Sequence, residues 1–220
     1  MPGGLAALLA TVAILLIPRS AFAEQQAPQV VDLLPDLIVR EADLYSYDIV
    51  TNIIPGHIHL RFANGTPNIG LGKLYFFGVL PPINDSQQVV DQRVFRSDGT
   101  FYDRQAGIFQ YHPAHNHVHF NGWCQYRLRQ ILPNDGIGPI VIEADKTSFC
   151  VVDLAIYDRN LPNYNPFGEF FDCGPDKQGL SVGWMDIYGR STEGQNIDIT
   201  NVNAGTYWLE SQVNPDTSVL

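Results

Sequence analysis

The sequence predicts a mostly β protein, a single β-sandwich-like domain with long loops and little helix. Apolar or alternating runs of strand length are separated by turn residues about every eight to twelve positions, the spacing of β sandwiches. Charged residues make up only 16% of the chain, which has 19 Gly and 15 Pro, and this composition favours turn-rich β structure over helical bundles. A chain of 220 residues can bury one good core, so we expect one domain.

The first 23 residues are expected to be a signal peptide rather than part of the fold. Leu5 to Ile17 form an apolar run too short for a comfortable membrane span, and an A-x-A cleavage site ends at Ala23. The segment before this run has no Lys or Arg, so only the amino terminus supplies positive charge there. We therefore expect a secreted, extracellular protein with no stable membrane insertion after cleavage, in which disulfides are permitted.

A polar leader at residues 24–34 is expected to precede the domain at 35–220. The domain should consist of short strands, because apolar and polar residues alternate over runs bounded by Gly, Pro, Asn and Asp. The expected strands are Pro35–Val39, His57–Phe62, Lys73–Leu80, a histidine strand at 115–119, Trp123–Leu132, Ile140–Glu143, Phe149–Leu154 and Gly205–Val213. Residues 85–100 are polar and contain a Ser-Asp-Gly turn, and residues 158–167 are expected to be a loop.

Three histidines alternate strictly in one stretch: His115, His117 and His119. In an extended strand, residues two apart share a face, so we expect the three imidazoles to project from one side of a single strand. Imidazole suits zinc, copper, iron and nickel, and a three-histidine set leaves room for water or substrate. His112 has the opposite parity and lies beyond a proline, so we do not count it as a ligand. The alternative interpretation is a basic, hydrated strand edge.

Charge and the remaining histidines narrow the range of partners. The formal net charge is −10, which gives no support for nucleic-acid binding. An acidic surface attracts cationic partners, including amines, although acidity mainly serves solubility. His57 and His59 form a second pair two residues apart, but nothing nearby in the sequence supports a metal site there.

The histidine stretch resembles the copper-binding segment of the lysyl oxidase family, whose pattern is H-x-x-H-x-H-x-H followed by an aromatic residue and Y-x-L. Three later segments resemble that family in the expected order: K-x-S-F-C-x-x-D, then Q-G-L-S with D-x-Y-G, then I-D-I-T with G-x-Y and V-N-P. These motifs lie at 112–128, 146–153, 178–189 and 197–215. The resemblance runs from about Pro35 to the end and is dense from Tyr111 onward.

The resemblance implies a secreted, copper-dependent amine oxidase that converts primary amines to aldehydes with O2, with peptidyl lysine as one candidate substrate. It assigns copper to the three alternating histidines and predicts that Lys146 and Tyr188 are joined as lysine tyrosylquinone. The quinone carbonyl would condense with the amine, a base would remove a proton from its α-carbon, and oxygen would reoxidise the cofactor. Asp186 lies two residues before Tyr188, on the same face if that segment is extended, and is our candidate base.

The sequence also departs from the family pattern. Animal lysyl oxidases have more cysteines, including one just before the first ligand histidine, where this chain has Ala114. This chain has Cys124, Cys150 and Cys173. We expect a disulfide between the last two, with limited support from the family, and a free Cys124. We expect a distant, microbial type of member for which collagen and elastin are not established substrates. The family usually continues beyond V-N-P, so we expect a fragment or a shortened variant.

Two other functions compete with the oxidase. A non-catalytic extracellular metal-binding β-domain would keep the histidines but never form the quinone. A zinc hydrolase would also use three histidines and an open position, but no H-E-x-x-H segment supports it. The presence of both Lys146 and Tyr188 favours the oxidase over both alternatives.

Overall fold

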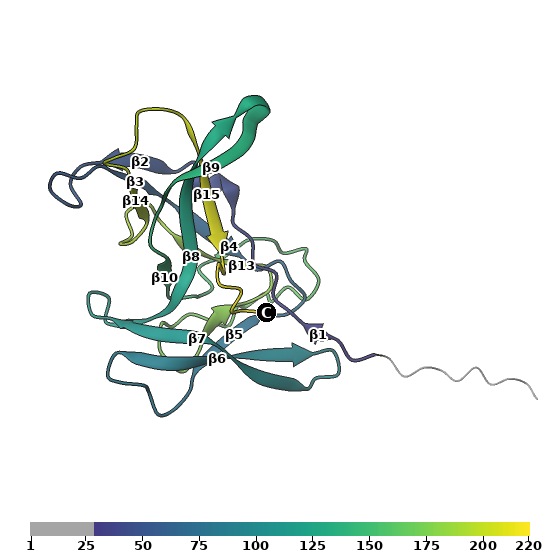
Figure 1. The fold of residues 1–220 in the computed structure, drawn as a ribbon. Helices are drawn as coiled ribbons and strands as arrows, with labels where there is room; N and C mark the ends of the chain where they lie inside the picture. Colours follow the sequence, from purple (N-terminus) through teal and green to yellow (C-terminus); the bar gives the residue numbers. More distant parts are fainter. Residues whose placement is uncertain (1–28) are drawn as a thin grey trace, which may run out of the picture.

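The computed structural model describes residues 29–220 and confirms a mostly β protein (Figure 1). The expected signal peptide lies outside these residues. Within the described range, one short α-helix, α1 (Glu41–Leu44), and one 3₁₀ turn, η1 (Pro133–Asp135), accompany the strands. No helix in residues 29–220 has the length and apolar character needed to cross a bilayer.

The largest sheet is antiparallel and is organised around one long strand, β8 (His117–Leu132). In order across the sheet run β10 (Thr147–Phe149), β8, β7 (Phe101–His112), β6 (Gln87–Arg96), β5 (Leu74–Gly78) and β12 (Gln178–Leu180). Three more strands extend it: β1 (Asp32–Leu33) pairs with β6, while β9 (Gly136–Glu143) and β15 (Tyr207–Val213) pair with β8. β8 therefore contacts four strands, and its first residues include two of the predicted ligands.

Two small sheets complete the fold. One contains β11 (Ala155–Ile156), β13 (Trp184–Tyr188) and β4 (Asn64–Pro67), and the other contains β14 (Asn196–Asp198), β3 (His59–Phe62) and β2 (Tyr47–Val50). Both pack toward β8 in Figure 1, where β13 and β4 lie behind its middle and β2, β3 and β14 lie beside its upper part. The candidate base and the candidate quinone tyrosine both lie on β13.

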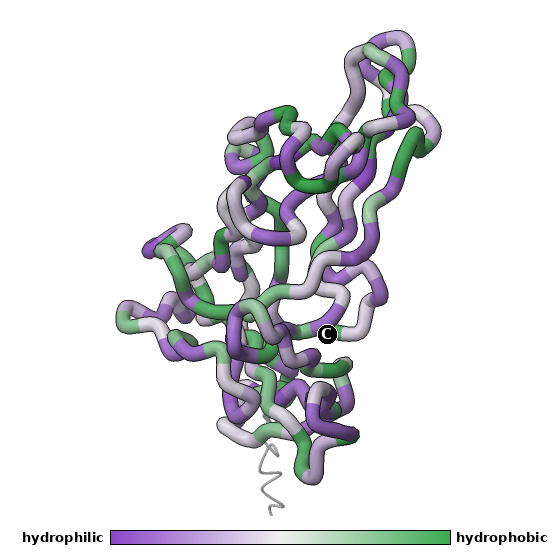
Figure 2. Tube along the Cα trace, turned by 90° about the vertical axis from the view of Figure 1, so that its left-hand side faces the viewer, coloured by the Kyte–Doolittle hydropathy of each residue, from purple (hydrophilic) through white to green (hydrophobic). Residues whose placement is uncertain are grey.

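Aromatic side chains make up much of the core. Phe76 on β5 stacks on Phe120 of β8, with ring centroids 4.4 Å apart, and Trp123 meets both rings edge-on. Phe62 on β3 packs edge-on against Tyr126 of β8 at 4.8 Å, which ties the second small sheet to the large one. Hydrophobic and hydrophilic segments alternate along the strands in Figure 2, as expected for sheets with one buried face.

Several expected elements differ from the structure. The expected strand Phe149–Leu154 is a strand only at Phe149, the last residue of β10. The first expected strand makes only an isolated bridge, Leu37 to Asn68, because its amide groups at Ile38 and Arg40 donate to β4 without a continued ladder. The end of the expected leader instead forms β1 in the large sheet. β6 runs through the polar segment that contained only a predicted turn. Every second residue from Val90 to Val94 is buried, but the one in the middle is Gln92, so the sequence does not show an apolar alternation.

The predicted disulfide between Cys150 and Cys173 is present, with its Cα atoms 5.4 Å apart. It joins the residue after β10 to the loop before β12, at the back of the histidine strand. Cys124 is free and buried, and its sulfur accepts a hydrogen bond from Nδ2 of Asn64 at 3.3 Å. The expected Cys150–Cys173 disulfide and the expected free Cys124 are therefore both confirmed.

Candidate metal centre and its surroundings

The three predicted ligands converge, but only two of them lie on the histidine strand. His117 and His119 occupy the first and third positions of β8, as the alternation predicts. His115 lies in the turn between β7 and β8, so the prediction of three rings on one strand was wrong for this residue. The turn is possible because Asn116 adopts a φ of 55°, a left-handed conformation that Asn tolerates better than most residues.

The ring nitrogens are spaced as ligands of a single ion would be. Nδ1 of His115 lies 3.3 Å from Nε2 of His119, and Nε2 of His117 lies 2.9 Å from the same atom. Ligands about 2.0–2.1 Å from an ion, at angles between square and tetrahedral, are separated by roughly 2.8–3.4 Å. One ligand atom from each of the three histidines lies within 4.8 Å of the others. The donor set and its spacing thus fit a bound transition-metal ion.

The local environment keeps these rings neutral. Burial, followed by the nearby His117, lowers the pKa of His119 to about 3, and burial also lowers the pKa of His117. His119 is only 4% exposed. A neutral imidazole has a free lone pair, which is the form that binds metals. At neutral pH these two rings are therefore ready to act as ligands without first losing a proton.

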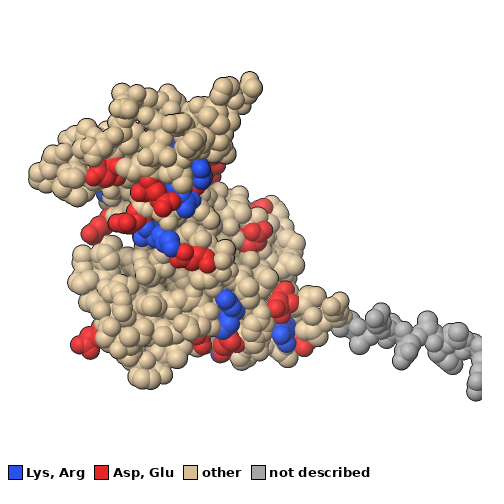
Figure 3. All heavy atoms as spheres, viewed as in Figure 1, with Lys and Arg blue, Asp and Glu red and all other residues tan. Residues whose placement is uncertain are grey.

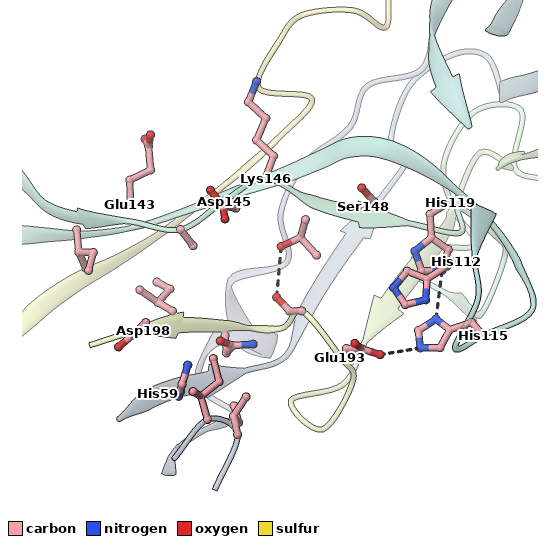
Figure 4. A pocket seen from close by; sticks show the side chains of 18 residues that line it. His59, His112, His115, His119, Glu143, Asp145, Lys146, Ser148, Glu193 and Asp198 are labelled. Carbon is pink, nitrogen blue, oxygen red and sulfur yellow. Dashed lines mark hydrogen bonds and ion pairs between the residues drawn. The ribbon is translucent and has the colours of Figure 1, made fainter. Parts of the chain in front are cut away.

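Lys146 lines the same cavity as the histidine cluster but its amine turns away from it. The cavity has a volume of about 610 Å³ and is lined by His59, His112, His115, His119, Lys146 and Glu193, among others. The amine of Lys146 forms an ion pair with Asp216, and Figure 4 shows its side chain pointing away from the histidines. Both partners are substantially exposed, so this pair contributes little stability.

Tyr188 lies behind β10 rather than on the wall of the cavity. Its ring stacks on Phe149 with centroids 3.7 Å apart, and Phe149 pairs with Phe120, the residue after His119. The Tyr188 hydroxyl accepts a hydrogen bond from the backbone N–H of Cys150 at 2.7 Å. Burial raises the pKa of this phenol well above its usual value. The reacting atoms of Lys146 and Tyr188 are thus held by different partners, on either side of β10.

Asp186 is the most unusual titratable group near the site. It lies on β13 two residues before Tyr188, as predicted, and is 0% exposed. Among the described residues, neither carboxylate oxygen has a hydrogen-bond partner. Burial raises its pKa well above the usual value, and the charge of Asp153 adds to the effect. An unpaired buried carboxyl group is unfavourable for stability, which makes Asp186 a candidate functional residue.

Comparison with known proteins bears on the whole region that holds these residues. The profile of the lysyl oxidase family matches residues 95–220, more than half of the chain. The chain belongs to the lysyl oxidase family. It is 34% identical to lysyl oxidase homolog 1 of Homo sapiens over 119 residues, which is 54% of this chain and 19% of the relative. It is 32% identical to protein-lysine 6-oxidase of Homo sapiens over 111 residues, 49% of this chain and 23% of the relative.

The lysyl oxidase relatives are thus matched over a minor part of their length. Lysyl oxidase homolog 3 of Homo sapiens is 33% identical over 112 residues, which is 50% of this chain and 13% of that relative. The chain spans about a quarter or less of these relatives. All six predicted site residues fall inside the part that matches the lysyl oxidase profile.

Two further groups lie beside the three predicted ligands: one was excluded by the sequence analysis and the other was missed. His112 ends β7 opposite His117, and its ring stacks on those of His115 and His119 at 4.4 and 4.9 Å. The parity argument that excluded it fails because His112 lies on a neighbouring strand. Glu193, in the loop between β13 and β14, places a carboxylate oxygen 3.6 Å from Nε2 of His115. Its only sequence clue is that it is the single acidic residue between Asp186 and Asp198.

The depressed histidine pKa values predict how the metal-free lysyl oxidase domain responds to acid. Between pH 7 and 5 the unfolded chain protonates its histidines near pH 6.5, whereas folded His119, with a pKa of about 3, stays neutral. The unfolded state then binds more protons, so the free energy of unfolding should fall as pH decreases through this window. Urea denaturation after treatment with a chelator measures it. His119→Gln should weaken the pH dependence, and an unchanged slope in that variant would contradict the assignment.

Proposed function

We propose that this chain is a secreted copper-dependent amine oxidase that converts primary amines to aldehydes with O2. Its cofactor would be lysine tyrosylquinone made from Lys146 and Tyr188, and peptidyl lysine is a candidate substrate. The observation that carries the proposal is the convergence of three histidine ring nitrogens beside a cavity that Lys146 also lines. Membership of the lysyl oxidase family supports copper as the ion, and imidazole ligands suit it.

Copper at His115, His117 and His119 would, with O2, supply the oxidation of the Tyr188 phenol ring. The rest of the task falls to the chain itself. The Lys146 amine must leave Asp216 and lose a proton, and its usual pKa is about 10.4. Release from Asp216 is inexpensive, because exposed ion pairs typically contribute about 0–1 kcal/mol. The Tyr188 ring must leave its partner Cys150 and approach the cavity, so joining the two residues requires a movement around β10.

Asp186 is suited to move a proton once the cofactor exists. A general base works best when its pKa lies near the working pH, and burial shifts the pKa of Asp186 upward from its usual acidic value. Asp186 and Tyr188 lie two residues apart on β13 and so share a face, which supports a role for Asp186 near the proposed quinone. Residues that line the cavity include the carboxylates of Glu143, Asp145 and Glu193, which favour a cationic amine. Acidic side chains are interspersed with basic ones in a band across the face seen in Figure 3.

The second candidate function is a metal-binding β-domain without a quinone. It is favoured by one observation: Lys146 points toward Asp216, and Tyr188 is not among the residues that line the histidine cavity. The two functions differ in whether Lys146 and Tyr188 become covalently joined after copper and air are supplied.

Peptide mapping distinguishes them. Protein loaded with copper in air should yield the tryptic segments of Lys146 and Tyr188 fused, and phenylhydrazine should label the fused peptide. Lys146→Ala should lose the fusion and amine oxidation while it still binds copper, because no predicted ligand is changed. Two separate, unmodified peptides from copper-loaded wild type would rule out the oxidase and leave the metal-binding domain.

The copper assignment has its own test. His117→Ala should lose the copper that survives gel filtration, because it removes one of three converging nitrogens. His57→Ala is the control, since the His57 ring bonds Asp198 at 2.6 Å and does not belong to the cluster. Metal analysis of both variants gives the result. Equal copper loss in the two would place the ion elsewhere.

A further inference from the structure

We infer that His112, His115 and Glu193 form a second metal position, which captures a divalent ion from solvent and passes it to the three-histidine centre. The inference rests on the copper site proposed above. One ligand atom from each of these three residues lies within 4.8 Å of the others. They come from the end of β7, the following turn and the loop between β13 and β14, so only the fold brings them together. Two imidazoles and a carboxylate suit copper or zinc.

His115 belongs to both positions through different nitrogens. Its Nδ1 faces His119 at 3.3 Å, and its Nε2 faces Glu193 at 3.6 Å. A neutral imidazole has one lone pair for a metal and carries its proton on the other nitrogen. The two positions therefore compete for His115. This competition favours transfer of one ion between them over permanent occupation of both.

Exposure decreases along the line from Glu193 to His119. The Glu193 side chain is 65% exposed and that of His115 is 27% exposed, whereas His119 is 4% exposed. Figure 4 shows Glu193 facing His115 from the loop, with the His112 and His119 rings lying above His115 in this view. An ion arriving from solvent thus meets the carboxylate first and the buried imidazole last. Negative charge at the entrance raises the rate at which cations arrive.

A simpler role for Glu193 would be to orient His115 by accepting its ring N–H, as carboxylates often do beside metal ligands. The 3.6 Å distance is longer than a hydrogen bond, and this role gives His112 no part. Nδ1 of His112 is buried and has no hydrogen-bond partner among residues 29–220. A nearby ion would give the His112 ring a partner. If Glu193 only oriented His115, the His112 ring would have none.

Copper uptake by metal-free protein tests the inference, with Cu²⁺ alone as the probe. Stopped-flow quenching of tryptophan fluorescence should show uptake about tenfold slower in Glu193→Gln than in wild type, at low ionic strength. The final copper content should remain that of wild type. Asp145→Asn is the matched control: it removes a carboxylate from the same cavity wall, and its uptake should change much less. Zn²⁺ should give the same order of rates, since the step involves no redox change.

A second measurement isolates the position itself. The double variant His117→Ala with His119→Ala should still bind Cu²⁺ weakly, with nitrogen and oxygen ligands in its electron paramagnetic resonance spectrum, and adding Glu193→Gln should remove this signal. Equal uptake rates in wild type and Glu193→Gln, equal slowing by Asp145→Asn, or weaker final binding at an unchanged rate would each overturn the inference. Failure of wild type to take up any copper would instead refute the proposed copper centre.

Discussion

Tyr188→Phe is expected to abolish amine oxidation while the protein still folds and still binds copper. Without the phenol oxygen the ring is not oxidised to a quinone, so the substrate amine has no carbonyl to react with. Enzymes typically accelerate reactions by about 10⁶-fold or more, so loss of the cofactor should bring the rate to background. The stacking of the ring on Phe149 survives the substitution. The expected stability loss is about 1–3 kcal/mol, from the Cys150 N–H that loses its acceptor.

Hydrogen peroxide release from a simple primary amine, measured beside copper content and thermal unfolding, checks this expectation. Tyr207→Phe is the matched control, because it also deletes a hydroxyl with one backbone partner, the carbonyl of Asn203. It should keep full activity. A Tyr188→Phe protein that oxidises amines at a rate near that of wild type would show that the catalyst does not use this residue.

Asp186→Asn is expected to lower the rate of amine oxidation. Its free energy of unfolding relative to wild type should also be higher at neutral pH than in acid. A positioned general base typically contributes 10²–10⁴-fold to a rate, so a loss of about that size is expected. The stability effect follows from the raised pKa of the buried carboxyl group. Such a group stabilises the fold fully below its unfolded pKa, near 3.9, and this contribution is lost as pH rises toward the folded pKa, at about 1.4 kcal/mol per unit. Asparagine does not titrate, so the stability of the variant relative to wild type should increase as pH rises above about 4.

Urea denaturation of both proteins across this range gives the difference in their free energies of unfolding at each pH. The new amide changes this difference by the same amount at every pH, so only the titration of Asp186 makes it vary. Asp153→Asn is a comparison for the absolute stability at one pH. Asp153 is also buried, but its carboxylate accepts hydrogen bonds from the backbone N–H groups of Glu169, Phe170 and Ser181 and from the Ser181 hydroxyl. Asp153→Asn should therefore destabilise the fold. If Asp186→Asn follows the same pH curve as wild type, Asp186 is not the perturbed group.

Features that depend only on residues close together in the sequence could be predicted. The mostly β class and the alternation of His117 with His119 follow from turn spacing and strand geometry, and the structure has both. The disulfide, expected with support from the lysyl oxidase resemblance, is also present. β6 was missed because its polar residues conceal a buried alternation, which becomes visible only beside its partners β5 and β7.

Features that depend on which strands pair, and in which register, could not be predicted from the sequence. His112 reaches the cluster because it lies opposite His117 across two strands, and Glu193 reaches it from a loop far along the chain. No local pattern specifies that register. His115 joins the cluster through a turn, so the parity argument placed it among the clustered rings for a reason that does not hold. The burial of Asp186 likewise depends on sheets that meet only after folding.

The pairing of β8 with β15 can form only after the proposed site residues have been synthesised. All seven residues of β15 pair with residues 124–130, directly after the segment of β8 that carries His117 and His119. During synthesis that part of β8 has no partner on this side until residue 213 has left the ribosome. The histidines and both residues proposed for the quinone are made well before then. The nascent chain therefore presents the three proposed ligand histidines before the sheet that holds them is complete on this side, which happens only when β15 pairs with β8.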